Sequence, residues 1–421
     1  MRILRLALPV FAMLLPCLST VASAIDLTGQ SATYLQSRQE FDSTRLMPLY
    51  EYLNFSAEDL GSKNLSFHFG GWYRYDLRNE SFGTKSTGDL QYAYLGYRAA
   101  TANAFLDLGR VVVNQGGAIE QVDGASAGTD LKYGFGISAF GGVPVETAFD
   151  TRTGDSVYGG RISHEVSGIY SIGVSYLRER NDKTDFRKEE GLDLWFRPFD
   201  KVELLGTTLY NATTSAVARN AYNLILGSFS ILTLRTEFTQ IQYKDFFTST
   251  TLSAFQLQPG GPVDPNDKLT TLGEEASLAF GAVAFSADYK KYHYLIEGNA
   301  DSYGGRLAYT GPSGVGVGAT AHRMDGQTDK LRYYEYRAYA YKTFGKTEVA
   351  IDLLTVTYDA EINGVKNAYS ASLAGGYALT PALKVGADIE YAKNPFFDKD
   401  VRGLVKLVYN FDTAHAAQGG K

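Results

Sequence analysis

The chain has 421 residues, with 40 Lys and Arg against 46 Asp and Glu, a net charge of −6, one Cys, and 30 Tyr, 24 Phe and 2 Trp. This composition excludes a disordered chain, a disulfide-stabilised scaffold and, with a mean hydropathy of −0.18, a helical membrane protein. The negative charge also argues against a nucleic-acid binder, which needs clustered Lys and Arg to displace counterions from phosphates.

The N-terminus has the three parts of a secretory signal. Arg2 and Arg5 precede an apolar run over residues 6–18, and a small-residue cleavage site follows at 22–24. We therefore expect residues 1–24 to be a signal peptide that is absent from the mature chain.

The single cysteine, Cys17, lies inside that signal. A lipidated first residue is disfavoured there, because Pro16 stands where a small residue is expected. A mature chain without cysteine cannot form disulfides, thioether-linked haems, Cys-ligated zinc or Fe–S clusters. We expect no cofactor in this chain, so any redox role must use a cofactor held by another protein.

The mature sequence alternates apolar and polar residues instead of forming the roughly 18-residue apolar runs of spanning helices. In residues 383–391 the odd positions are apolar or aromatic, whereas the even ones include Lys384, Asp388 and Glu390. Residues 232–239, 283–290 and 405–411 follow the same period of two. Such strands fit either a membrane β-barrel or a soluble sandwich with one wet face.

The connections favour the barrel, because short and long ones alternate when the chain is read backward from Phe411. Ten strands fit between about Asp245 and Phe411. Ten more are expected upstream, near residues 64–77, 90–98, 104–113, 131–140, 157–164, 169–178, 192–197, 202–211, 217–226 and 230–241. If the long connection 179–191 is extracellular, the alternation of strand direction in the upstream half is off by one strand. One membrane crossing is therefore missed or split in this assignment.

The expected fold is therefore all-β: a transmembrane antiparallel β-barrel of about 20 strands (18–22), with short periplasmic turns and longer extracellular loops. We expect the barrel over residues 64–411 and a C-terminal tail over 412–421. Residues 25–63 are left as a periplasmic segment, a lumenal segment or an extra strand pair, notably through 49–55.

Aromatic residues support a membrane location, because many fall near expected strand ends. Amphipathic aromatic side chains, with a polar and an apolar end, are typical of the headgroup region of a membrane. We expect this position for Trp72, Tyr73, Tyr75, Tyr92, Tyr94, Phe246, Phe247, Tyr333, Tyr334, Tyr336, Tyr409 and Phe411.

A family resemblance is carried by three successive segments. Ala104–Arg110, a Gly-rich stretch with Val122–Gly124, and residues 137–145 resemble the strand, inserted loop and strand of bacterial outer-membrane porins. Within that group the chain also resembles the porin-like barrels that sheath multihaem cytochromes in the electron conduits of metal-reducing bacteria. The chain departs from this group in one respect. The assembly signal of these barrels usually ends on a C-terminal aromatic residue, whereas this chain continues for ten residues after Phe411.

The expected pore-lining residues are the charged positions that strand parity turns inward. Their signs are nearly balanced, so they imply no strong ion selectivity. They are Asp107, Arg161, Arg235, Glu237, Asp288, Lys290, Glu335, Arg337, Asp352, Lys384, Asp388, Glu390 and Lys406.

A constriction loop is expected within residues 114–132, which are rich in glycine and follow the porin-like strand. The alternative is a mobile extracellular loop. Its acidic residues are Glu120, Asp123 and Asp130. If the segment narrows the pore, these carboxylates should face lumenal Arg161, Arg235 or Arg337.

Two functions remain, and no catalytic residue or metal site is expected. His68, His293 and His322 are scattered single histidines without a second ligand at metal-site spacing. The first function is an outer-membrane channel for passive diffusion of small hydrophilic solutes or ions. The second is the barrel sheath of a porin–cytochrome complex. The expected partners are outer-membrane lipid, the solutes or ions, and multihaem cytochromes in the second case; a homo-oligomer is left open.

Overall fold

The computed structural model describes residues 25–39, 44–81, 83–145, 155–181, 184–243 and 267–413. The expected signal peptide, nearly all of the expected C-terminal tail, and the strand expected just after Asp245 lie outside the described residues.

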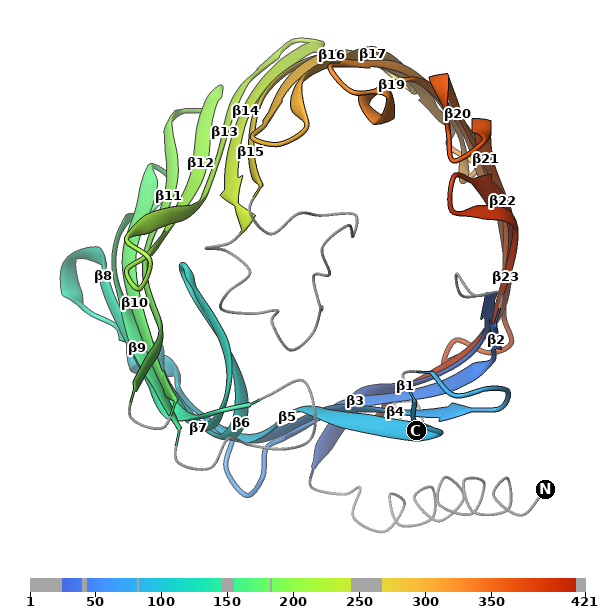
Figure 1. The fold of residues 1–421 in the computed structure, drawn as a ribbon. Coiled ribbons are helices and arrows are strands. Elements are labelled where there is room, and N and C mark those ends of the chain that lie inside the picture. Colours follow the sequence, from blue (N-terminus) through green and yellow to red (C-terminus); the bar gives the residue numbers. More distant parts are fainter. Residues whose placement is uncertain are drawn as a thin grey trace.

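The described chain forms a ring of antiparallel strands (Figure 1). The strands are β1 (Asp26–Gln39), β2 (Arg45–Leu46), β3 (Pro48–Glu58), β4 (Leu65–Asp76), β5 (Ser86–Ala99), β6 (Ala104–Gln115), β7 (Ala118–Asp130), β8 (Phe135–Pro144), β9 (Ser156–Val166), β10 (Tyr170–Asn181), β11 (Thr184–Phe199), β12 (Val202–Asn211), β13 (Ala216–Phe229), β14 (Leu232–Gln242), β15 (Lys268–Phe280), β16 (Val283–Tyr294), β17 (Gly298–Thr310), β18 (Val315–Gly326), β19 (Arg332–Phe344), β20 (Thr347–Ile362), β21 (Val365–Ala378), β22 (Leu383–Asn394) and β23 (Phe397–Asp412). Three short 3₁₀ turns, η1 (Ala100–Ala102), η2 (Lys132–Gly134) and η3 (Asp329–Leu331), lie in connections.

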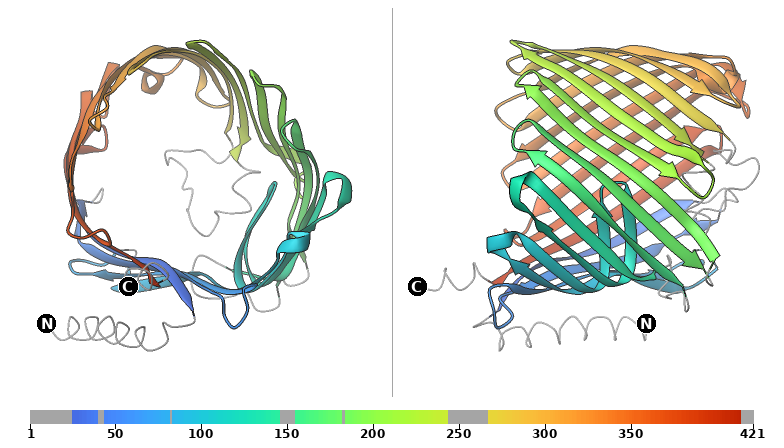
Figure 2. Two further views of the ribbon diagram at one scale, coloured as in Figure 1. Left: turned by 180° about the vertical axis from the view of Figure 1, so that it is seen from behind. Right: turned by 90° about the vertical axis from the view of Figure 1, so that its left-hand side faces the viewer.

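The ring is closed by the first and last strands. β1 pairs with β23 from Thr28 opposite Asp412 to Ser37 opposite Gly403, and with β3 on its other side. Because β2 pairs only with the end of β1, the barrel has 22 strands. Closure removes the unpaired edge that an open sheet would expose to lipid. Figure 2 shows the strands tilted across the wall.

The expected barrel is thus confirmed, and the missed crossing is β7. β7 pairs with both β6 and β8, although its residues were expected to form a loop. The wall also begins at Asp26 instead of the expected boundary at residue 64, because β1 and β3 supply the strand pair left open for residues 25–63.

Both ends of the described chain lie at one end of the barrel, here called the terminal end. Connections there are short, such as 200–201, 281–282 and 345–346, whereas the far end carries longer ones such as 77–85 beside short ones such as 363–364 and 395–396. The expected asymmetry of turns and loops is therefore present in only part of the described ring.

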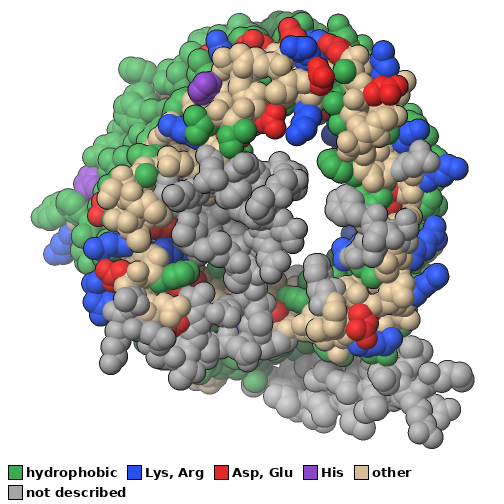
Figure 3. Space-filling model, viewed as in Figure 1, with side chains coloured by type: hydrophobic (Ala, Val, Ile, Leu, Met, Phe, Trp, Pro, Cys, Tyr) green, Lys and Arg blue, Asp and Glu red, His purple; other side chains and the backbone are tan. Residues whose placement is uncertain are grey.

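The outer face carries an apolar belt between two aromatic girdles. Alternate residues of β17–β23 supply the belt: Leu307, Val317, Ile351, Leu353, Leu373, Ile389, Val405 and Leu407. Toward the terminal end this belt is bordered by Phe280, Tyr309, Phe344 and Tyr377, and toward the far end by Tyr289, Tyr303, Tyr334, Tyr336, Tyr369 and Tyr391. Hydrophobic side chains cover the visible outer flank in Figure 3, whereas charged ones gather at the rim. Such a belt with aromatic girdles matches a bilayer and its headgroups.

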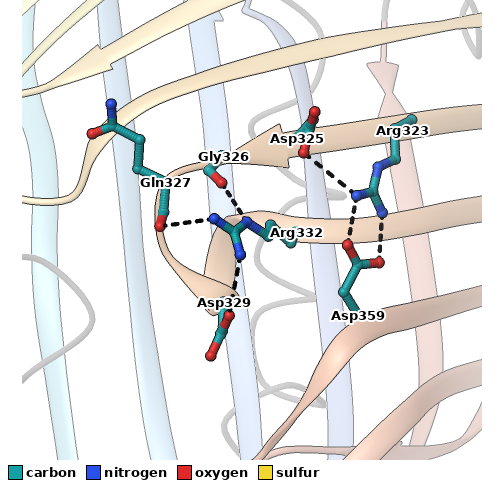
Figure 4. A network of polar contacts seen from close by, with 7 residues as sticks. All are labelled: Arg323, Asp325, Gly326, Gln327, Asp329, Arg332 and Asp359. Carbon is teal, nitrogen blue, oxygen red and sulfur yellow. Dashed lines mark hydrogen bonds and ion pairs between the residues drawn. The ribbon is translucent and has the colours of Figure 1, made fainter.

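An ion-pair network lies beyond the far-end aromatic girdle (Figure 4). The Arg323 guanidinium donates to both Asp359 oxygens, at 2.7 and 2.6 Å, and sits 4.5 Å from the Tyr334 ring centroid. Arg332 donates to the Gly326 carbonyl at 2.7 Å and lies 3.7 Å from Asp329. These charges mark where the apolar belt ends.

Part of the aromatic prediction is wrong. Trp72, Tyr92 and Tyr94 share the inward parity of their strands, and Tyr92 lies over inward Gly70. Tyr73, Tyr334 and Tyr336 do face outward, as expected. Phe246 and Phe247 lie outside the described residues.

No helix in the described part of the chain is long and apolar enough to cross a membrane.

Candidate functional site: the lumen and its hairpin

A β-hairpin leaves the wall and enters the lumen. The pairing of β6 with β5 stops at Arg110, and the pairing of β7 with β8 stops at Val122, so residues 111–120 have strand partners only within the hairpin. Gly109 has a φ of +133°, which only glycine adopts easily, and it marks the bend. We call residues 111–122 the lumenal hairpin; Figure 1 shows it inside the ring.

An apolar cluster holds the lumenal hairpin against the inner wall. Val111, Val113 and Val122 are buried among side chains of β8, β9 and β10. Those wall side chains are Phe140, Val157 and Leu177, and Tyr94 packs against the edge of the cluster. This cluster resembles a small protein core, and burying each such side chain stabilises by about 1.5–3 kcal/mol.

A buried ion-pair group adds a polar attachment. Arg187 on β11 donates to Glu120 of the lumenal hairpin at 2.7 Å and to Glu189 at 2.6 Å. The Arg187 and Glu189 side chains are only 5% and 1% exposed. Charges that far from water are stable only when they are paired.

The tip of the lumenal hairpin reaches the middle of the wall. The Gly117 amide donates to the Ser175 hydroxyl at 3.0 Å. A Cβ on Gly116 would overlap the Asp193 carboxylate, and one on Gly117 would lie 2.8 Å from the Gly191 Cα. Glycine is therefore required at the tip because the two backbones meet closely.

These contacts correct the expected partners of the loop carboxylates. Glu120 pairs with Arg187, and Asp123 pairs with Arg110 at the base of the lumenal hairpin at 2.7 Å. Asp130 accepts from Asn103 at 2.6 Å near the terminal end. The expectation that these carboxylates face Arg161, Arg235 or Arg337 is therefore wrong. The segment is also a paired hairpin and strand, not an irregular loop.

The inner wall away from the lumenal hairpin carries polar side-chain pairs that cross glycines. Glu237 and Lys290 bond at 2.5 Å across Gly273, which lies between them in the register. Asp288 and His322 lie 3.0 Å apart across Gly304 in the same way. A glycine beneath each pair lets long side chains lie flat on the wall.

Most expected pore-lining residues have such partners. Arg161 pairs with Asp193 across Gly173, where its Nε to Oδ1 distance is 2.9 Å. The others with polar partners are Arg337 with Asp352 at 3.0 Å, Lys406 with Asp388 at 3.3 Å, Arg235 with Glu237 at 3.8 Å, and Glu390 with the Ser370 hydroxyl at 2.7 Å. Asp107 lies opposite Gly96, Glu335 opposite His322, and Lys384 opposite Ala378.

Strand alternation in the sequence did not identify Asp193, the partner of Arg161, or the pair of Arg187 and Glu189 that holds Glu120. The long connection expected over 179–191 hid the strand β11 that carries them. A second missed set is the inward aromatics of β1, β3 and β4. The parity signal for Trp72 was present, since it shares its face with His68 and Arg74.

No cluster of three or more potential metal ligands occurs among the described residues. The described inner wall carries paired charges, amides and aromatic rings.

Similarity to solved structures supports the architecture. No family model matches the sequence, and no curated protein matches it. Among solved structures, the chain is similar to a mutant of the ferric enterobactin receptor PfeA of Pseudomonas aeruginosa, with 10% identity, a TM-score of 0.57, and coverage of 91% of this chain and 80% of the receptor. It is also similar to the translocation pore of the P pilus usher PapC, with 10% identity, a TM-score of 0.52, and coverage of 91% and 99%.

The fold is that of an outer-membrane β-barrel. At this identity the likeness carries the fold alone. The apolar outer belt with its two aromatic girdles places the closed ring in a membrane, and closed barrels of this kind belong to the cell outer membrane.

Proposed function

We propose that the protein is a porin-like channel through which small hydrophilic solutes and ions diffuse passively across the outer membrane. The observation that carries the proposal is the inner wall, where charged side chains pair across glycines and face an opening along the ring axis (Figure 3). A lumen lined by side chains of both charges stays hydrated and selects only weakly between cations and anions.

In this proposal the lumenal hairpin narrows the channel on one side. Its docked position supports this role, because the buried cluster and the Arg187 group fix it to the wall. The proposed chemistry is binding and passage only, with residues 1–24 acting as the export signal.

The test is reconstitution of the purified full chain. In planar bilayers we expect stepwise, ohmic conductance, and in liposomes we expect swelling with small sugars and amino acids. A heat-dependent shift in gel mobility reports the folded barrel independently. Folded protein that inserts and yet carries neither ions nor solutes would overturn the channel.

The second candidate is a sheath around a multihaem cytochrome. It is favoured by the position of the lumenal hairpin, which is docked along one sector of the wall. Purification from native membranes separates the two, since a sheath co-elutes with haem absorbance and a channel does not.

A further inference from the structure

A continuous row of aromatic rings lies on the inner face of β1, β3 and β4. Tyr34 and Tyr52 have ring centroids 5.6 Å apart, Tyr52 and Tyr50 6.1 Å, and Tyr50 and Trp72 6.1 Å. All four side chains are partly exposed. We call Tyr34, Tyr50, Tyr52 and Trp72 the aromatic row.

The register turns this row into the lumen. Tyr34 lies opposite Lys406 on β23, whose ammonium pairs with inward Asp388. The neighbouring positions on the same strands, such as Leu407, are exposed on the outer face. The row is therefore not part of either membrane girdle, and its wet side is the channel.

Amide side chains lie beside the aromatic row on the same face. Asn410, Gln30 and Asn54 follow one another across β23, β1 and β3, and Gln30 donates to the Asn410 oxygen at 2.8 Å. Tyr92 extends this line by lying over Gly70 on β4. An amide offers both donors and acceptors, so the line can bond several hydroxyls.

The two basic side chains near the ends of the row are paired with carboxylates. At its far-end side, Arg74 is buried and lies 3.4 Å from Asp76, and at the other side Lys406 pairs with Asp388. One carboxylate, Asp89, lies opposite Trp72 in the register and can accept from a hydroxyl. The surface thus combines flat apolar rings with amides and one carboxylate, unlike the wall formed by β14–β22, which carries many ion pairs.

We propose that the aromatic row and its amides bind neutral oligosaccharides that pass along the inner face of β1, β3 and β4. The C–H faces of sugar rings stack on aromatic faces, and their hydroxyls bond to amides and carboxylates. This inference rests on the proposed channel and names the solute class that it favours.

The first experiment uses the two tryptophans of the chain, Trp72 and Trp195. The probe is maltotriose, added to the full chain in detergent while tryptophan fluorescence is recorded. Trp195 serves as the internal control, because it lies outside the row and donates to Glu203 at 2.7 Å. We expect a saturable change that Trp72→Phe abolishes and Trp195→Phe preserves.

The second experiment measures block of ion current by maltotriose in planar bilayers. Tyr52→Ala should weaken the block about tenfold or more, because it removes the ring that links its neighbours. Tyr52→Phe keeps the ring and should keep the block, which also separates binding from folding. Tyr339→Ala is the matched control, because Tyr339 is an inward ring on the opposite wall that bonds to Arg306.

The outcomes distinguish the two proposals. A current that maltotriose reduces no more than a polyethylene glycol of equal size, with no Trp72 response, overturns the sugar row and leaves the channel intact. A Trp72 response without any conductance supports the row and overturns the channel. A response that survives in Trp72→Phe also overturns the row.

Discussion

Two sectors of the inner wall follow different physical rules. Under the lumenal hairpin, the wall of β8–β11 is shielded from water, with Leu177 0% exposed and Arg187 buried against Glu120 and Glu189. Across the lumen, the wall of β14–β22 is wet, and Arg337 is 51% exposed although it also pairs with a carboxylate. The same type of ion pair should therefore be indispensable in one sector and nearly dispensable in the other.

The largest expected effect comes from breaking the ion pair in the dry sector. Arg187→Met removes the guanidinium that pairs with Glu189, which is 1% exposed, and an uncompensated buried charge costs about 3–5 kcal/mol. The matched change in the wet sector, Arg337→Met, should cost about 0–1 kcal/mol. Guanidinium unfolding in detergent measures both, and equal losses would refute the distinction between the sectors.

The next effect compares the two faces of one strand. Leu373 on β21 is 51% exposed in the apolar belt, so Leu373→Arg should cost about 2–4 kcal/mol near the bilayer midplane. Ser372→Arg should be tolerated, because its inward side chain lies between Asp352 and Glu390 in the register. Outer-membrane assembly yield and unfolding midpoints report the difference; the opposite order would mean that the faces are reversed.

A smaller change should detach the lumenal hairpin without unfolding the barrel. Val122→Asp places a carboxyl in the apolar cluster, at a cost of about 1–3 kcal/mol even if it is protonated. Val112→Asp is the control, since Val112 lies on the other face of the same hairpin and is 56% exposed. Single-channel conductance should rise for Val122→Asp alone. Unchanged conductance in both variants would place the hairpin outside the permeation path.

The smallest effect on stability concerns a single charge in the wet sector. Asp352→Asn should change unfolding by less than about 1 kcal/mol, because water already screens the pair with Arg337. It should nevertheless shift the reversal potential toward anions, since the Arg337 charge is no longer balanced. A shift of the opposite sign would contradict the inward assignment of Asp352.

The strand faces were predictable from local sequence, but β7 was not. Period-two alternation is strong in β20–β23, where outward positions are large and apolar. In β7 the outward partner of Leu108 is Ala125, and the next ones are Ala127 and Thr129. Such small residues give almost no hydrophobic signal, so the sequence favours a loop there and the expected strand count falls short.

The partners of the inward charges were less predictable than their direction. Parity alone turned Arg161 and Glu237 inward, because a side chain's face depends only on its position in a strand. Their partners lie two strands away, across Gly173 and Gly273, and depend on the register of both intervening pairs. A change of one residue in either register would remove the pair.

The sequence by itself determined the class of fold and the two faces of the wall, because alternation is a property of a single strand and needs no partner. Only the tertiary structure decided that β1 meets β23, since that pairing joins the two ends of the chain. It also decided that residues 111–122 leave the wall and dock on β8–β11, and that the rings of β1, β3 and β4 form one row. Each of these depends on contacts between distant segments, which closure of the ring brings together.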